Sequence, residues 1–106
     1  MKSYVRLFIV KEGKENLWKS WCDQIEKKFK DKALRTLKQE GIIHESFINI
    51  EIDNITYTLA HIIVVGEEIT PADKENDLNI RHMKIKKECL LPVQNSAKIG
   101  YSFNAF

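Results

Sequence analysis

The chain has 106 residues, of which 43% are hydrophobic and 30% are charged. These fractions exclude a disordered chain and a collagen-like repeat. The 17 basic and 15 acidic residues leave a net charge of +2, which is too balanced to predict a nucleic-acid-binding surface. No apolar run approaches the roughly 20 residues of a membrane-spanning helix. We therefore expect one soluble domain over residues 1–106, with neither a membrane nor a nucleic-acid partner.

The N-terminal residues and the two cysteines indicate in which cellular compartment we expect the protein. Residues 1–6 do not have the pattern of a signal peptide, because no small-residue cleavage site follows the first apolar run. We therefore expect a cytoplasmic protein. Cys22 and Cys89 lie far apart in the sequence, and in a reducing compartment a disulfide between them is not favoured, although the sequence leaves it open.

The first half of the chain predicts a strand and a long helix. Residues 4–10 are rich in β-branched and aromatic side chains, which is typical of a strand. Beyond Gly13, apolar residues recur at three- and four-residue intervals from Trp18 to Leu37, with Trp18 and Trp21 on the buried stripe. This spacing predicts one amphipathic helix of about 25 residues that ends at Gly41.

The second half predicts a hairpin, a helix and a last strand. Ile42 to Ile52 and Thr56 to Val65 are β-rich runs joined by the turn-forming pair Asp53-Asn54. Thr70 followed by Pro71 predicts the start of a second helix. The apolar stripe of that helix consists of Leu78, His82, Ile85 and Cys89. Pro92 ends it, and the alternation over residues 98–105 predicts a final strand.

The resulting order, βαββαβ, predicts a ferredoxin-like α+β fold with two helices on one face of a four-stranded antiparallel sheet. The run from Thr56 to Val65 is largely apolar on both of its alternating faces, so the face without helices must also be covered. A second copy of the chain is the simplest cover. We expect a homodimer packed sheet to sheet.

A resemblance to a known family supports this arrangement. It is carried by four stretches: Lys11-Glu12-Gly13-Lys14, Thr36 to Gly41 with Glu45-Ser46-Phe47 beyond it, His82, and Lys86-Lys87-Glu88-Cys89. In these stretches the chain resembles a family of small uncharacterised bacterial proteins grouped with the dimeric α+β barrels. The resemblance implies a barrel formed across a dimer, with a pocket between each sheet and its own helices.

Members of that wider group include cofactor-independent monooxygenases, haem-degrading monooxygenases and lactone isomerases, so the fold leaves the chemistry open. The chain departs from the haem-degrading pattern because no asparagine lies in the first strand. No HxxxH, HxH or CxxC spacing is present to hold a metal, and no glycine cluster is present to hold a phosphate. We expect no metal and no cofactor.

Two histidines are the catalytic candidates. His82 lies on the apolar stripe of the second helix, where burial can bring its proton affinity near neutrality. The alternative interpretation is a packed histidine whose ring nitrogens bond to neighbouring groups. His61 lies on a strand face with Tyr57 and Leu59, where it could line a pocket.

Three further residues are ligand-binding candidates. Arg6 lies within the first strand, where its planar guanidinium suits a substrate carboxylate, and pairing with Glu45 or Glu51 across the sheet is the alternative. Tyr101 can donate a hydrogen bond into a pocket, and His44 can line one.

The sequence leaves open whether the chain is an enzyme. The first hypothesis is a dimeric binding or structural domain with a small apolar pocket that includes His82. The second is a cofactor-independent enzyme, of a monooxygenase or isomerase type, that acts on a small aromatic or lactone substrate. It requires at least two of His61, His82, Arg6 and Tyr101 at one cavity. The third is a partner-binding module that uses an exposed sheet face.

Overall fold

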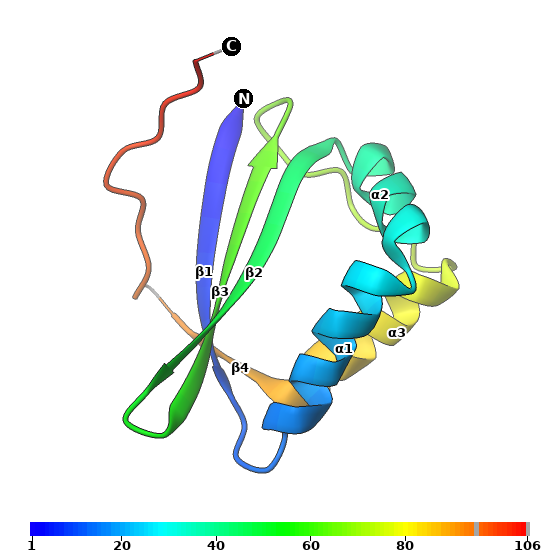
Figure 1. Ribbon diagram of the computed structural model, residues 1–106. Coiled ribbons are helices and arrows are strands. Elements are labelled where there is room, and N and C mark those ends of the chain that lie inside the picture. Colours follow the sequence, from blue (N-terminus) through cyan, green and yellow to red (C-terminus); the bar gives the residue numbers. More distant parts are fainter. Residues whose placement is uncertain (95, 106) are drawn as a thin grey trace.

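Three helices lie against one face of a four-stranded antiparallel sheet (Figure 1). The computed structural model describes residues 1–94 and 96–105. The elements in chain order are β1 (Lys2–Val10), α1 (Glu15–Lys27), α2 (Lys30–Gln39), β2 (Ile42–Ile52), β3 (Ile55–Val64), α3 (Asp77–Cys89) and β4 (Leu90–Val93). The strand order is β2-β3-β1-β4. The predicted α+β class and four-stranded antiparallel sheet are confirmed, whereas three helices stand where a plain ferredoxin-like βαββαβ has two.

The central hairpin forms as predicted. Asp53 and Asn54 have φ angles of 51° and 65°, which are the positive values that a two-residue hairpin turn requires at both positions. The turn pairs Ile52 with Ile55 and sets the register of β2 against β3 as far as His44, beyond which the register shifts by one residue. Because side chains alternate along a strand, this register assigns each residue of the hairpin to one face of the sheet.

The prediction of one long helix was wrong. The helix breaks at Lys28 and Phe29, whose amide nitrogens both donate to the Gln24 carbonyl, at 2.7 and 2.9 Å. The Phe29 ring then packs against Trp21, with ring centroids 5.9 Å apart. Neither glycine nor proline marks this break, so the apolar periodicity runs through it unchanged. The end at Gly41 is confirmed, because its φ of 72° is the left-handed conformation that closes a helix.

The predicted start of the second helix was also wrong. The helix α3 begins at Asp77, where the side chain of Asn76 accepts a hydrogen bond from the Asn79 amide at 3.1 Å. Thr70, where the helix was expected to start, instead donates its amide to the Glu40 carbonyl at 3.1 Å. The segment before α3 is therefore held to the end of α2.

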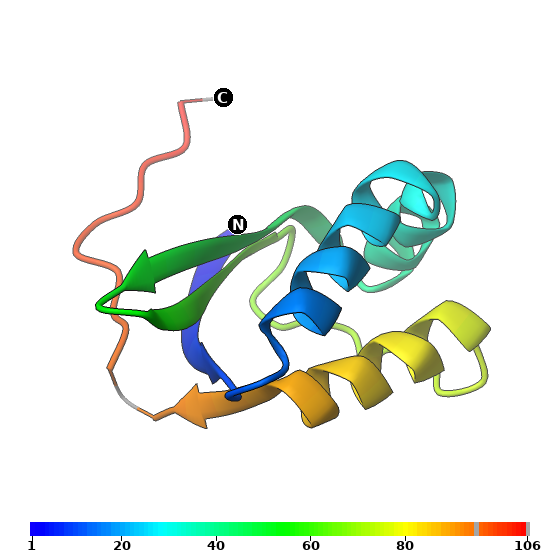
Figure 2. The same cartoon turned by 60° about the horizontal axis from the view of Figure 1, so that its bottom comes forward.

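The last strand lies earlier in the chain than predicted. Leu90–Val93 follows α3 directly and pairs with residues 7–10 of β1, so it occupies that part of the sheet edge. Residues 97–105 form no strand, and within them Tyr101 and Phe103 are 80% and 87% exposed. This tail runs on the side of the sheet away from the helices, as Figures 1 and 2 both show. A contact of 3.2 Å between the hydroxyls of Ser3 and Ser102 joins it to β1.

Helix α1 is held to the sheet and to α3 by its two tryptophans, which are 0% and 1% exposed. The indole nitrogen of Trp18 donates to Asn49 Oδ1 on β2 at 2.9 Å, and Thr58 donates to the same oxygen at 2.8 Å. The indole nitrogen of Trp21 donates to His82 Nδ1 on α3 at 2.9 Å. The core interpretation of both tryptophans is confirmed.

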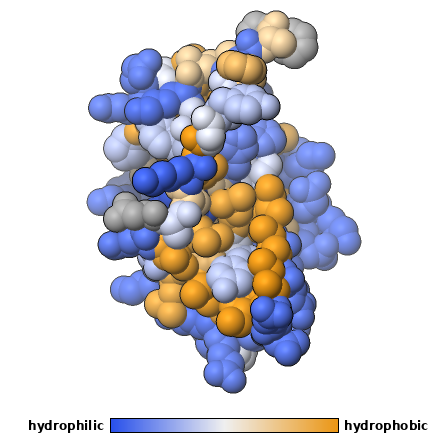
Figure 3. Space-filling model, turned by 90° about the vertical axis from the view of Figure 1, so that its left-hand side faces the viewer, coloured by the Kyte–Doolittle hydropathy of each residue, from blue (hydrophilic) through white to orange (hydrophobic). Residues whose placement is uncertain are grey.

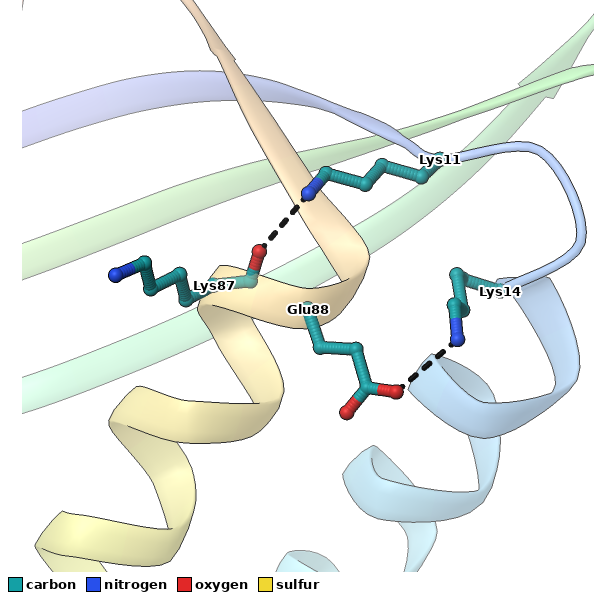
Figure 4. A network of polar contacts seen from close by, with 4 residues as sticks. All are labelled: Lys11, Lys14, Lys87 and Glu88. Atoms are coloured by element: carbon teal, nitrogen blue, oxygen red, sulfur yellow. Dashed lines mark hydrogen bonds and ion pairs between the residues drawn. The ribbon is translucent and has the colours of Figure 1, made fainter.

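A polar contact joins the loop before α1 to the end of α3 (Figure 4). Lys11 donates its ammonium to the Lys87 carbonyl at 3.1 Å, and Lys14 forms an ion pair with Glu88 at 3.0 Å. The Lys11 amide also donates to the Cys89 carbonyl at 2.7 Å. Two of the stretches that carry the family resemblance, residues 11–14 and 86–89, therefore lie side by side.

We predict that Asn49→Leu lowers the free energy of unfolding by about 2–4 kcal/mol, because it leaves the buried donors of Trp18 and Thr58 without an acceptor. Thr58→Val is the matched control: it removes one donor, leaves the Trp18 bond intact and should cost about 1 kcal/mol. Urea denaturation measures both. Equal losses for the two variants would contradict the shared role of Asn49.

Candidate functional site

A cavity of about 340 Å³ lies between the sheet and the three helices. Its wall is largely apolar and includes Trp18, Ile25, Leu37, Phe47, Ile62 and Leu78. All three helices and the strands β2 and β3 contribute to the wall, so the fold as a whole defines its shape. Residues distant in the sequence therefore converge here around open space.

One part of this wall carries ionisable groups. Glu45 from β2, Glu40 from the end of α2 and Lys86 from α3 all line the cavity. Burial raises the pKa of both carboxyl groups, and the charge of Glu45 raises that of Glu40 further. Burial lowers the pKa of Lys86, an effect that Glu45 partly opposes. The lysine ammonium lies 5.7 Å from the centre of the Phe47 ring.

His82 lies next to this group, one helical turn before Lys86. Its ring packs between Trp21 and Phe47, with centroid distances of 6.1 and 5.8 Å. Burial, and then the positive charge of Lys86, lower the pKa of His82 to about 4. The imidazole is therefore neutral at physiological pH.

The other predicted site residues lie elsewhere. His61 and His44 are on the sheet face away from the helices, with ring centroids 5.7 Å apart, and Ser46 contacts the His44 ring at 2.7 Å. Tyr101 is in the exposed tail, where its ring packs on Phe103.

Arg6 extends over the Phe8 ring at 5.2 Å and lines a second hollow of about 310 Å³ beside β4. Within residues 1–94 and 96–105 it forms no ion pair with Glu45 or Glu51. The enzyme hypothesis requires at least two of His61, His82, Arg6 and Tyr101 at one cavity, and of these four His82 alone lines the main one. The roles assigned to all five candidates stay predictions.

Sequence reasoning missed Glu45 and Lys86 as site residues. Two signals could have identified them. Lys86 follows His82 by four residues and so lies on the same side of α3. Glu45 lies two residues before Phe47 on β2 and therefore on the same face, which places a carboxyl group on the helix-covered side of the sheet.

The described residues give no sign of a metal centre, since nowhere among them do three or more His, Cys, Asp or Glu side chains cluster. Cys22 and Cys89 are free thiols, the first half-buried and the second fully buried. None of the helices in the part of the chain described is long and apolar enough to cross a membrane.

With this geometry established, comparison with known proteins identifies a family. Residues 1–103 match the model of a family of unknown function, DUF6176. The chain belongs to this family. No curated protein and no solved structure matches it. The DUF6176 match spans every strand, every helix and every residue that lines the cavity, and it assigns them no activity.

The lowered pKa of His82 predicts a pH effect on stability. Below about pH 6.5 the unfolded chain protonates this histidine while the folded chain does not, so the free energy of unfolding falls until about pH 4. Above pH 6.5 both states are neutral and the effect vanishes. The loss is at most about 1.4 kcal/mol per pH unit. We predict that His82→Gln, which keeps an acceptor for Trp21, removes the part of the fall in the free energy of unfolding that comes from His82.

Urea denaturation of both proteins at several pH values between 4 and 7.5 tests this prediction, because subtracting one pH profile from the other isolates His82 from the nearby carboxyl groups. The difference should grow as the pH falls from 6.5. Parallel profiles would show that His82 accepts protons equally well in both states.

Proposed function

We propose that the protein is a homodimeric domain that binds a small, largely apolar molecule in the cavity between its sheet and its helices. The observation that carries this proposal is the convergence of Glu45, His82 and Lys86 on a cavity whose wall is largely apolar. Apolar pockets with a few convergent polar groups and shifted pKa values are typical of ligand sites.

The energetics of these groups support a binding role. Holding ionisable side chains in apolar surroundings is costly unless they pair closely. Within the described ranges, Glu45 and Lys86 form no ion pair within 4.0 Å, and burial shifts both of their pKa values toward the neutral forms. A ligand that bonds to them would offset this cost.

The size of the cavity limits the ligand. At about 340 Å³ it lies at the lower end of the range for small-molecule pockets. A molecule of one or two fused rings fits this volume. The rings of Trp18 and Phe47, with centroids 5.8 Å apart, offer an aromatic ligand flat surfaces.

The dimer is proposed from the sheet face that the helices leave uncovered, here called the open sheet face. It consists of the odd-numbered residues of β1, β3 and β4 and the even-numbered residues 44–52 of β2. None of these positions is Lys, Arg, Asp or Glu, in a chain that is 30% charged. Figure 3 shows apolar surface gathered on this side of the molecule.

A second copy suits this face better than a different partner does. An apolar patch of this extent is typical of an interface, and a face without formal charge offers no pattern for a charged partner. Two identical faces related by a two-fold axis are self-complementary. In such a dimer His44 and His61 would face the partner subunit. The domain would then be a three-helix variant of the ferredoxin-like arrangement, paired as a dimeric α+β barrel.

An enzyme acting on a small aromatic or lactone substrate is the second candidate, favoured by the shifted pKa values at the cavity. Within one chain, His61, Arg6 and Tyr101 do not line this cavity, so Glu45 and Lys86 would have to act there with His82 in the proton transfer and the anion stabilisation. Turnover of a bound ligand would distinguish the enzyme from a binding domain.

We predict that Ile48→Lys converts the protein to a monomer, because it places a charge within the open sheet face. Ile80→Lys is a closely matched control: Ile48 and Ile80 are 47% and 49% exposed, and Ile80 lies on α3, away from that face. Light scattering after size-exclusion chromatography should give a dimer mass for the wild type and Ile80→Lys. A monomeric wild type would contradict the dimer and favour the partner-binding module.

We predict that Ala33→Leu, which fills the cavity, abolishes ligand-induced stabilisation. At a hundredfold excess over Kd a ligand adds about 2.7 kcal/mol, which raises the Tm of a domain of this size by several degrees. The two-ring probes 1-tetralone and tetralin should show this increase with the wild type and with the surface variant Ser20→Leu. An equal increase in Ala33→Leu would place the binding elsewhere.

A further inference from the structure

The hydrogen bond from Trp21 to His82 determines where the histidine carries its proton. An indole nitrogen always bears a hydrogen and cannot accept one, so the bond of 2.9 Å requires a free lone pair on His82 Nδ1. In a neutral imidazole the single hydrogen then lies on Nε2. Because Trp21 is only 1% exposed, water does not compete for this bond.

The second ring nitrogen is free to meet a ligand. The bond from Trp21 is the one hydrogen bond recorded for the His82 ring among the described residues. In the same residues no fully buried side-chain nitrogen or oxygen lacks a partner. Nε2 is therefore accessible, and the space that His82 lines is the cavity. The packing of the ring between Trp21 and Phe47 limits its rotation.

The charges around His82 indicate what kind of acceptor fits. Lys86 is the cation at this part of the wall, and Glu40 and Glu45 are two carboxyl groups beside it. With Glu26, three carboxyl groups and one ammonium line the cavity, so their ionised forms would on balance repel a ligand carboxylate, whereas a neutral carbonyl oxygen accepts a hydrogen bond without that repulsion.

We infer that Trp21 holds His82 as a fixed hydrogen-bond donor, and that the cavity selects a small apolar molecule carrying a neutral acceptor oxygen, such as a ketone or a lactone. This inference rests on the proposed function and specifies its ligand class. His82 contacts the ligand, while Trp21 acts through His82 and is a positioning residue.

The tautomer is tested without any ligand. Long-range ¹H–¹⁵N correlation spectra of the wild type at pH 7 should show a protonated Nε2 and an unprotonated Nδ1 for His82, with the other two histidines assigned by His44→Gln and His61→Gln. In Trp21→Phe the ring should show a mixture of tautomers. A protonated Nδ1 or a charged ring in the wild type would overturn the inference.

The ligand class is tested with two probes of nearly equal shape. The ketone 1-tetralone carries a carbonyl oxygen, and tetralin lacks it. We expect 1-tetralone to bind the wild type roughly three- to tenfold more tightly, as one added hydrogen bond gives. His82→Phe should lose this preference while still binding tetralin. His82→Gln keeps both an acceptor for Trp21 and a donor amide, and should retain part of the preference.

The outcomes separate the two proposals. Equal affinity of the wild type for the two probes would overturn the selection of an acceptor oxygen and leave the binding domain standing. Failure of both probes to bind would overturn the proposed function and, with it, the ligand class. If Trp21→Phe does not fold, the two His82 variants still decide between these outcomes.

Discussion

The arrangement of the molecule depends on two buried indole hydrogen bonds from one helix. Trp18 bonds to the sheet through Asn49, and Trp21 bonds to α3 through His82. A buried N–H donor without a partner is costly, so α1 cannot turn or slide without losing one of these bonds. The helix therefore holds the sheet and α3 at a fixed separation. The cavity is the space that remains between them. His82, which lines the cavity, accepts the hydrogen bond from Trp21.

The alternation of side chains along the strands gives the two sheet faces different roles. Glu45 and Phe47 on β2 face the helices and line the cavity, whereas His44 and Ile48 belong to the open sheet face. None of the charged residues of the strands lies on the open sheet face, and this is consistent with the proposal that a second chain buries that face. One sheet thus carries the cavity, which is the proposed ligand site, on one side and the proposed subunit interface on the other.

The sequence patterns predicted which helices and strands form better than they predicted where these elements end and which side chains meet. The hairpin turn could be predicted because Asn and Asp are common at turn positions with positive φ angles. The end of α2 could be predicted because glycine commonly takes the positive φ angle that follows a helix. The break at Phe29 was not readable, since it follows from packing against Trp21 and not from a helix-breaking residue. The tail alternates like a strand, yet residues 97–105 form none, and the last strand is Leu90–Val93, which pairs with residues 7–10 of β1. Periodicity placed His82 toward the sheet, but its partner Trp21 is 61 residues away, and contacts at that distance come from the fold.

The most direct test of the account is a titration of the isotope-labelled wild-type protein with 1-tetralone, followed by chemical shifts of backbone amides, the indole N–H groups and the methyl groups. We expect the shifted signals to belong to residues that line the cavity, with the Met83 methyl among them, and to the indole of Trp21, which bonds to His82, while Ile48 and Ile50 on the open sheet face stay unchanged. Shifts confined to the open sheet face, or none at saturating probe, would contradict a ligand site between the sheet and the helices.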